Sequence, residues 1–183
     1  MRTEPVDVSL VKDPSLIIYN AILELPGIYL ATNGDQTDTI VETLRAGGTF
    51  DDALGTRERE PDAPNYTPRI SGMLDFNRQP VEIALSILKG NVVDPELTDR
   101  FTFRPAEPPP GLGYCITTYQ GDGKPLPPFQ GDPLLMPCEG SVEEVLSAYW
   151  DALDADNRVS LAVKTIPAEG GPGEIVVKNR FEG

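Results

Sequence analysis

The chain has 183 residues, and its 29 acidic and 15 basic side chains give it a net charge of -14. This length predicts one domain, residues 1–183, with a sizeable core. The negative charge excludes nucleic acid and anionic lipid as expected partners, because both are bound through basic side chains. The apolar runs are far shorter than a membrane span and the N-terminus has no apolar signal segment, so we expect a cytoplasmic protein.

Turn-forming residues divide the first third of the chain into short elements. In chain order, we expect a strand or short helix at 15–22, a strand at 27–32, a helix from about Thr37 to the glycines at 47–48, a helix from Thr49 to about Arg57, and an extended loop at 60–68. Thr39 and Glu42 have the spacing of a capping box, and Asp52 follows Thr49 at the same spacing. The prolines of the loop exclude regular structure there, because proline fixes its backbone and lacks an N–H donor.

The rest of the chain predicts paired strands and one amphipathic helix. We expect strands at 70–76 and 81–88 around a turn at 77–80, a surface loop at 105–110, a strand at 113–119, a turn at 121–125, a helix at 141–153, and strands at 158–166 and 174–178. Ser141 and Glu144 have capping-box spacing, and Trp150 lies on the apolar face of this helix, so we expect it in the core. Strand pairs alternate with helix pairs and not in strict βαβ order, which predicts the α+β class.

The sequence contains no histidine and only two cysteines, which limits its chemistry. A Ser-His-Asp triad, a histidine base and histidine-containing zinc sites are excluded, so acid–base work falls to Glu, Asp, Tyr, Lys or Cys. Cys115 and Cys138 lack CxxC spacing, and Cys115 lies in an apolar run. We interpret both as free, buried thiols in preference to a disulfide or a nucleophile.

Two segments, residues 32–40 and 58–70, concentrate polar side chains at the boundaries of apolar runs. Their amides, carboxylates and hydroxyls are suited to bind a small ligand. A purely structural interpretation stays open, in which residues 33–35 form a turn and Thr37 and Asp38 cap a helix. The two interpretations are compatible, because the start of a helix points free N–H groups at whatever lies in front of it.

Four blocks of sequence, in order, resemble the IMP cyclohydrolase-like family, which was first known from archaea and is also found in bacteria. The blocks are residues 12–20 (KDPSLIIYN), 32–40 (TNGDQTDTI), 59–70 (REPDAPNYTPRI) and 113–119 (GYCITTY). The resemblance covers nearly the whole chain. It implies a four-layer αββα sandwich similar to that of the N-terminal-nucleophile hydrolases. It also implies an enzyme that closes formamido-imidazole-carboxamide ribotide (FAICAR) to IMP with loss of water, the last step of purine synthesis.

The resemblance also implies roles for individual residues. Tyr19, Glu60 and Arg69 are the implied catalytic residues, with the first two handling protons and Arg69 stabilising oxyanion charge or holding substrate. The implied substrate-binding residues are Asn20, Asn33, Thr37 and Asp38. From the residues alone, Glu60 could instead form an exposed ion pair, and Arg69 could be a surface residue or a cap partner. The expected partner is the purine nucleotide, without a metal ion or organic cofactor, and a homo-oligomer is compatible with the sequence.

The N-terminus differs from the family pattern. The family lacks the nucleophile after which its fold is named, and Met1-Arg2 supplies none here. Family members carry a segment before the position of Thr3, with a Gly-Arg pair and an Arg-rich stretch that helps to bind the phosphorylated substrate. This sequence starts after that segment, so we expect the 183-residue chain alone to aggregate and to be inactive. An upstream segment is expected to restore both properties.

Two other functions stay open at this point. One is an amidohydrolase of the same fold that opens a different cyclic amide. The other is a non-catalytic module that binds purine nucleotides. Turnover of an IMP analogue would identify the first, and binding of IMP without turnover would identify the second.

Overall fold

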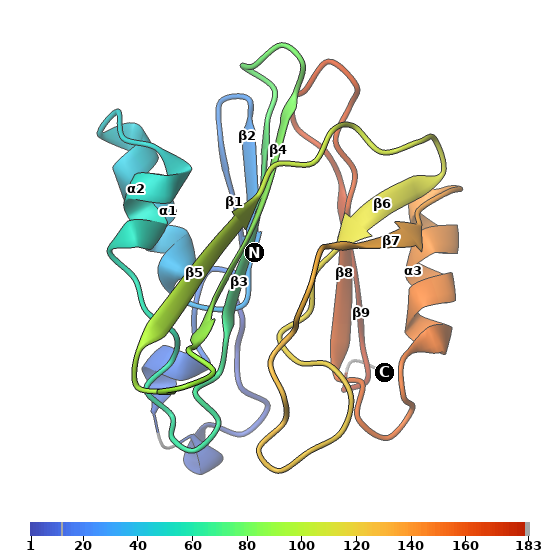
Figure 1. Cartoon of the computed structure of the whole chain (residues 1–183). Helices are drawn as coiled ribbons and strands as arrows, with labels where there is room; N and C mark the ends of the chain where they lie inside the picture. The colour runs from blue at the N-terminus through green and yellow to red at the C-terminus, as the bar shows by residue number, and fades with distance from the viewer. Residues whose placement is uncertain (12, 182–183) are drawn as a thin grey trace. The chain divides into compact units, whose positions relative to one another are not determined.

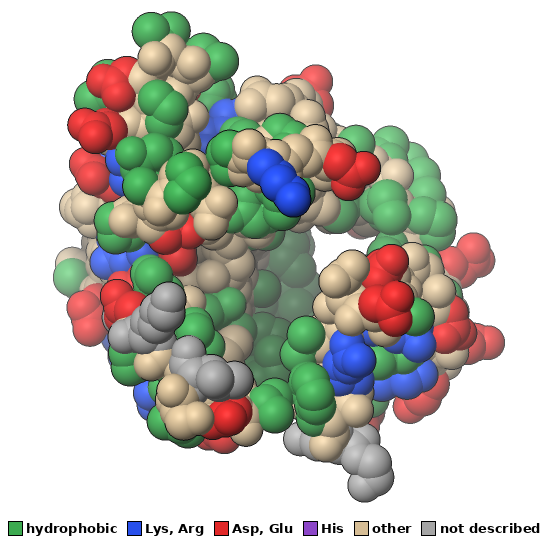
Figure 2. Space-filling view, turned by 90° about the horizontal axis from the view of Figure 1, so that it is seen from below, with side chains coloured by type: hydrophobic (Ala, Val, Ile, Leu, Met, Phe, Trp, Pro, Cys, Tyr) green, Lys and Arg blue, Asp and Glu red, His purple; other side chains and the backbone are tan. Residues whose placement is uncertain are grey.

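The computed structural model describes residues 1–11 and 13–181 and divides the chain into two compact units (Figure 1). The first unit comprises Met1–Glu107 and Cys115–Leu134, and the second comprises Pro108–Tyr114 and Leu135–Gly183. No helix among the described residues is long and apolar enough to cross a membrane. Figure 2 shows acidic side chains scattered over the face that it displays, in keeping with the net charge of -14.

A five-stranded antiparallel sheet forms the centre of the first unit, with its strands in chain order. The strands are β1 (Ile22–Leu25), β2 (Ile28–Thr32), β3 (Arg69–Asp75), β4 (Glu82–Gly90) and β5 (Thr98–Phe103). Helices α1 (Gln36–Arg45) and α2 (Phe50–Gly55) lie on one face of the sheet (Figure 1). Two short 3-10 helices, η1 (Val8–Leu10) and η2 (Pro14–Leu16), precede it. Helices packed on an antiparallel sheet confirm the α+β class.

The core of this unit lies between the helices and the sheet. Its buried apolar side chains are Leu30, Ile40, Val41, Phe50, Ala53, Leu54, Met73, Ala84 and Leu88. Leu30 pairs with Met73 and Met73 pairs with Ala84 across the strands, so these three side chains share the sheet face that meets the helices. Arg69 pairs with Leu88 on the same face, which places a buried arginine at the edge of the core.

The starts of α1 and α2 are determined in different ways, one by a tertiary contact and the other by a local sequence signal. The hydroxyl of Thr49 accepts the backbone N–H of Asp52, and the Asp52 carboxylate accepts the N–H of Thr49, so the capping box of α2 is confirmed. The capping box predicted for Thr39 and Glu42 is wrong, because α1 already begins at Gln36. Gln36 is fully buried and donates to a backbone carbonyl of β3, so a tertiary contact sets the start of this helix.

Most of the strands predicted for the first unit are present. The predictions at 27–32, 70–76 and 81–88 are confirmed as β2, β3 and β4, and the loop at 60–68 contains no helix or strand. Of the ambiguous run at 15–22, only the ends belong to η2 and β1. The sequence did not predict β5, because the only apolar residues in that polar edge strand are two phenylalanines.

The second unit contains a helix packed on a strand pair. Strands β8 (Ser160–Lys164) and β9 (Ile175–Asn179) are antiparallel, and α3 (Val142–Ala152) packs on both. The predicted capping box of Ser141 and Glu144 is confirmed. Trp150 is only 6% exposed, which confirms it as a core residue. Strand β6 (Leu112–Cys115) pairs with β7 (Leu134–Pro137), and the sequence did not predict β7.

The two cysteines are free thiols, as predicted. Burial was expected for both and is only partly found: Cys115 is half-buried, whereas Cys138 is exposed. Cys138 directly follows β7 and precedes the N-cap of α3, so it lies in a surface connection and not in an element that packs.

Candidate functional site

Arg69, the first residue of β3, lies at the centre of the site and is only 6% exposed. Its Nη1 donates to Asp35 Oδ1 at 2.6 Å and to Gln36 Oε1 at 3.0 Å. Its Nε donates to the carbonyl of Glu58 at 2.9 Å, and Nη1 lies 3.4 Å from Glu60 Oε1. Contacts from two separate segments therefore hold the guanidinium in one orientation, and the alternative of Arg69 as a surface residue is wrong.

Glu60 is buried beside Arg69. It is 6% exposed, so the alternative of an exposed ion pair is wrong. Burial raises the pKa of Glu60, the positive charge of Arg69 opposes this rise, and the negative charges of Asp62 and Asp35 add to it. A buried carboxyl group with a raised pKa and a cationic partner at 3.4 Å is suited to exchange protons.

The loop that carries Glu60 is fixed by its own hydrogen bonds. The backbone N–H of Glu60 donates to the carbonyl of Thr67 at 2.9 Å, which closes the loop. The carboxylate of Asp62 accepts the Thr67 N–H at 2.7 Å and its hydroxyl at 2.5 Å. Arg59, also buried, donates through Nε to the carbonyl of Pro95 at 2.8 Å. The structure therefore presents the Glu60 carboxyl group on a braced loop, so little reorganisation is needed to place it.

Asp35 joins two arginines. Its Oδ1 accepts Nη1 of Arg69 and Nη2 of Arg57, both at 2.6 Å. Burial alone would raise the pKa of Asp35, but the hydrogen bonds and positive charges of Arg57 and Arg69 outweigh it and hold the pKa below its ordinary value. Asp35 is therefore ionised at neutral pH and fixes Arg69, while the partly exposed Arg57 adds a second guanidinium to the site.

Gly34 lies in contact with this network. A Cβ atom at this position would lie 2.5 Å from Gln36 Oε1 and 2.6 Å from Arg69 Nη1. Both side chains are buried and bonded to each other, so neither can move aside without breaking contacts of the site.

The substitution Gly34→Ala is expected to lower the free energy of unfolding by about 1–3 kcal/mol, because it overpacks a filled site. Chemical unfolding measures this value. Gly55→Ala is the matched control: nothing lies within 4 Å of a Cβ there, and alanine favours the end of α2 where it falls. If both substitutions changed the free energy of unfolding equally, the site would accommodate a Cβ atom at Gly34 without loss of stability.

Tyr19 and Asn20 are held beside the start of α1. The backbone N–H of Tyr19 donates to the hydroxyl of Thr3 at 3.0 Å, and the Thr3 N–H donates to the Tyr19 carbonyl at 2.9 Å. Burial raises the pKa of the Tyr19 phenol, and the negative charge of Glu60 raises it further, so the two groups interact electrostatically. Asn20 Nδ2 donates to Asp38 Oδ1 at 2.8 Å, in the first turn of α1.

Asn33 uses its whole side-chain amide within the protein. Its Nδ2 donates to the carbonyl of Pro68 at 2.9 Å and to the hydroxyl of Thr118 at 3.0 Å. Its Oδ1 accepts the N–H of Ile70 at 2.8 Å and Nε2 of Gln36 at 3.2 Å. With two donors and two lone pairs engaged, Asn33 braces the site and has no free group for a ligand.

Thr37 also has a structural role. It is fully buried, and its hydroxyl donates to the carbonyl of Gly34 at 3.0 Å and bonds the hydroxyl of Thr32. The structure therefore brings Glu60 and Arg69 into contact, and Tyr19 lies near enough for the negative charge of Glu60 to raise the pKa of its phenol. Asn20 and Asp38 form a pair at the start of α1, whereas Asn33 and Thr37 support the backbone that carries the site.

Sequence reasoning missed three members of the site: Asp35, Gln36 and Arg57. The first two lie in the polar block at 32–40, for which the sequence leaves both a ligand-binding and a turn interpretation open. No local spacing indicates that Asp35 meets arginines 22 and 34 residues further along the chain. The contact depends on the pairing of β2 with β3.

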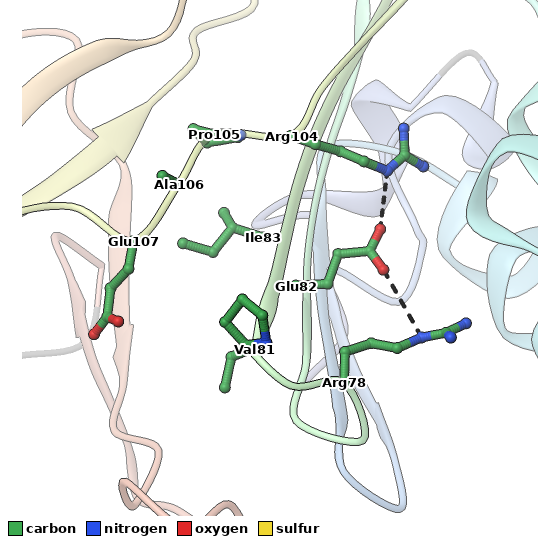
Figure 3. Close-up of a pocket in the computed structure, with 9 residues that line it drawn as sticks. Arg78, Val81, Glu82, Ile83, Arg104, Pro105, Ala106 and Glu107 are labelled. Atoms are coloured by element: carbon green, nitrogen blue, oxygen red, sulfur yellow. Dashed lines mark hydrogen bonds and ion pairs between the residues drawn. The ribbon is translucent and has the colours of Figure 1, made fainter.

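A hollow lies at the start of β4, the end opposite Leu88, which pairs with Arg69. It has a volume of about 540 Å³, and Figure 3 shows Glu82 between Arg104 and Arg78 on one side of it. Arg104 Nε donates to Glu82 Oε1 at 2.9 Å, and its Nη2 donates to Asp51 Oδ2 at 2.5 Å. The carboxylates of Glu82 and Asp51 thus engage the guanidiniums along this hollow.

A family model described as IMP cyclohydrolase-like protein matches residues 1–170. A search of curated proteins found no match. The resemblance expected from the four sequence blocks is therefore confirmed.

Proposed function

The chain belongs to the IMP cyclohydrolase-like protein family, and on this premise we propose that it closes FAICAR to IMP with loss of water. The observation that carries the proposal is the buried pair of Glu60 and Arg69, at 3.4 Å, with Tyr19 close enough to sense the charge of Glu60. Ring closure needs a base, an acid and a stabiliser of oxyanion charge, and these three side chains can supply one each.

The first half of the reaction forms the ring. The carboxamide nitrogen attacks the formyl carbon, and its proton passes to the carboxylate of Glu60. Negative charge develops on the formyl oxygen, where Arg69 stabilises it and the phenol of Tyr19 donates a proton. The product of this half is a cyclic intermediate with a hydroxyl on the former formyl carbon.

The second half releases water. The hydroxyl leaves with the proton that Glu60 holds, and the ring nitrogen that came from the formamide gives its proton to the Tyr19 phenolate. A carbon–nitrogen double bond forms, and both side chains return to their starting protonation states. Positioning contributes as much as proton transfer, because the reacting nitrogen and carbon must be held in contact.

The pKa directions support this division of roles. The raised pKa of Tyr19 keeps the phenol protonated at neutral pH, as a donor requires. The raised pKa of Glu60 strengthens it as a base while leaving it ionised above that pKa. Asn20 and Asp38 are the proposed contacts to the base and ribose of the nucleotide.

The value of kcat/KM for FAICAR is expected to rise with pH through the pKa of Glu60, which lies above its ordinary value of 4.5. The rise occurs because only the ionised carboxylate accepts the carboxamide proton. A pH–rate profile of the natural protein measures it, and Glu60→Gln should abolish this limb. A rate that instead falls with pH through the same range would make Glu60 the acid.

The direct test of the function is an assay of the purified natural protein with FAICAR. Formation of IMP supports the proposal. Binding of IMP without turnover would indicate a nucleotide-binding module, and turnover of another cyclic amide with no effect on FAICAR would indicate a different amidohydrolase.

We further propose the four-layer αββα arrangement for this chain. Its support is a sheet with helices on one face and apolar residues on the other, since Ile70, Leu74 and Ile83 point away from α1 and α2. The family model spans parts of both compact units, which supports a single domain.

A further inference from the structure

A cavity of about 440 Å³ lies in the first unit, and residues 64–66 of the Glu60 loop form part of its wall. Five prolines, at 64, 95, 125, 127 and 128, form much of its wall together with the rings of Tyr66 and Phe101. Its volume falls within the range of about 300–1,000 Å³ that small-molecule sites occupy. Apolar, rigid walls with flat rings are suited to a planar ligand.

Lys89 and Asp99 are the charged residues that line this cavity, and Lys89 supplies its positive charge. The residue is 6% exposed, and its Nζ donates to the carbonyl of Phe129 and to Gln130 Oε1, both at 2.8 Å. The ammonium group lies 5.1 Å from the centre of the Phe101 ring. An ammonium has three N–H donors, so one remains after these two bonds.

The charge of Lys89 is only partly balanced by the protein. Asp99 pairs with Lys89 across the strands, but its carboxylate accepts Nδ2 of Asn91 at 3.0 and 3.2 Å. In the described part of the chain, Lys89 forms no salt bridge within 4.0 Å. Burial of a positive charge without an anion is unfavourable, so an anionic group in the cavity would be stabilised there.

The cavity is distinct from the Arg69 site. Arg69 pairs with Leu88, and neighbouring residues of a strand point to opposite faces, so Lys89 and Arg69 lie on opposite faces of the sheet. Arg59 nevertheless connects the cavity with the Arg69 site. Its guanidinium lies 4.3 Å from the centre of the ring of Tyr66, which lines the cavity. Arg59 directly precedes Glu60 in the chain.

We propose that this cavity is a second binding site, which takes a small molecule with a flat ring and one anionic group, and that Lys89 binds the anion. The proposal is independent of the cyclohydrolase reaction. A carboxylate and a phosphate share this chemistry, and the test separates them.

The test titrates the natural protein with benzoate, phenyl phosphate and the neutral benzamide, and measures affinity by NMR. At least one anion should bind, and benzamide should bind about 10- to 100-fold more weakly, the range for a hydrogen bond to a charged group. The stronger of the two anions identifies the preferred group. Failure of both anions to bind, or equal binding of benzamide, would overturn the proposal.

Two variants locate the binding. Lys89→Met should weaken the anion about 10- to 100-fold but leave benzamide unchanged. Leu126→Trp, at a lining residue that is 42% exposed, should fill the cavity and abolish binding while Lys89 stays in place. Arg78→Met is the matched control, since it removes one positive charge from the turn that precedes β4. Unchanged affinity in the first two variants would place the anion elsewhere and refute the site.

Discussion

Replacement of Glu60 by glutamine is expected to lower the turnover of FAICAR by about 10²- to 10⁴-fold, the range for loss of a general acid–base group. The amide keeps the shape of the side chain but cannot take the carboxamide proton. Substrate affinity should change much less, because Arg69 keeps its bond to Asp35. Steady-state kinetics and a separate binding measurement of IMP distinguish the two effects.

The stability of this variant gives an internal check. The folded-state pKa of Glu60 is raised, so the folded protein binds the proton more tightly than the unfolded chain does. The free energy of unfolding therefore falls as pH rises from the ordinary value through the raised one. Above this pH range the ionised carboxylate of Glu60 lowers the free energy of unfolding. The neutral side chain of the Glu60→Gln variant avoids this loss, so the variant should stay folded at neutral pH.

The control for this experiment is Glu58→Gln. Glu58 is exposed, and only its backbone carbonyl contacts Arg69. The same chemical change at this position should leave turnover within about twofold, as is usual for a surface substitution. If Glu60→Gln also stayed within twofold, Glu60 would have no part in proton transfer.

Local signals predicted much of the fold. The capping boxes at Thr49 and Ser141 place two helices, and the prolines after Glu60 predict the extended loop. Where the prediction failed, long-range contacts decided the outcome. The start of α1 depends on the bond from Gln36 to β3, and the polar edge strand β5 exists because β4 pairs with it.

In the site, too, local sequence signals predicted less than long-range contacts determine. Spacing alone left Glu60 and Arg69 as surface candidates, and only the family resemblance singled them out. Their burial follows from the closure of the loop by Thr67 and from the pairing of β2 with β3. The role of Asp35 as a bridge between two arginines could not be read from the sequence, because both partners are distant along the chain.

Arg69→Ala is expected to weaken IMP binding or turnover by an amount equivalent to about 1.5–3 kcal/mol, the range for hydrogen bonds to a charged group. In a chain with a net charge of -14, a phosphorylated substrate depends on local positive charge of this kind. The substitution also leaves Glu60 buried without its cation, so stability should fall as well. Thermal unfolding measured beside the kinetics separates the two losses, and Arg78→Ala, at an arginine whose side chain is 67% exposed, is the control.

Arg69→Lys decides which property of the arginine matters. The guanidinium reaches Glu58 through Nε and reaches Asp35 and Gln36 through Nη1, a planar fork that a single ammonium group cannot reproduce. Lysine should therefore restore only part of the activity lost in the alanine variant. If it restored all of it, positive charge alone would suffice at this position, and the bonds that orient Arg69 would have no part in catalysis.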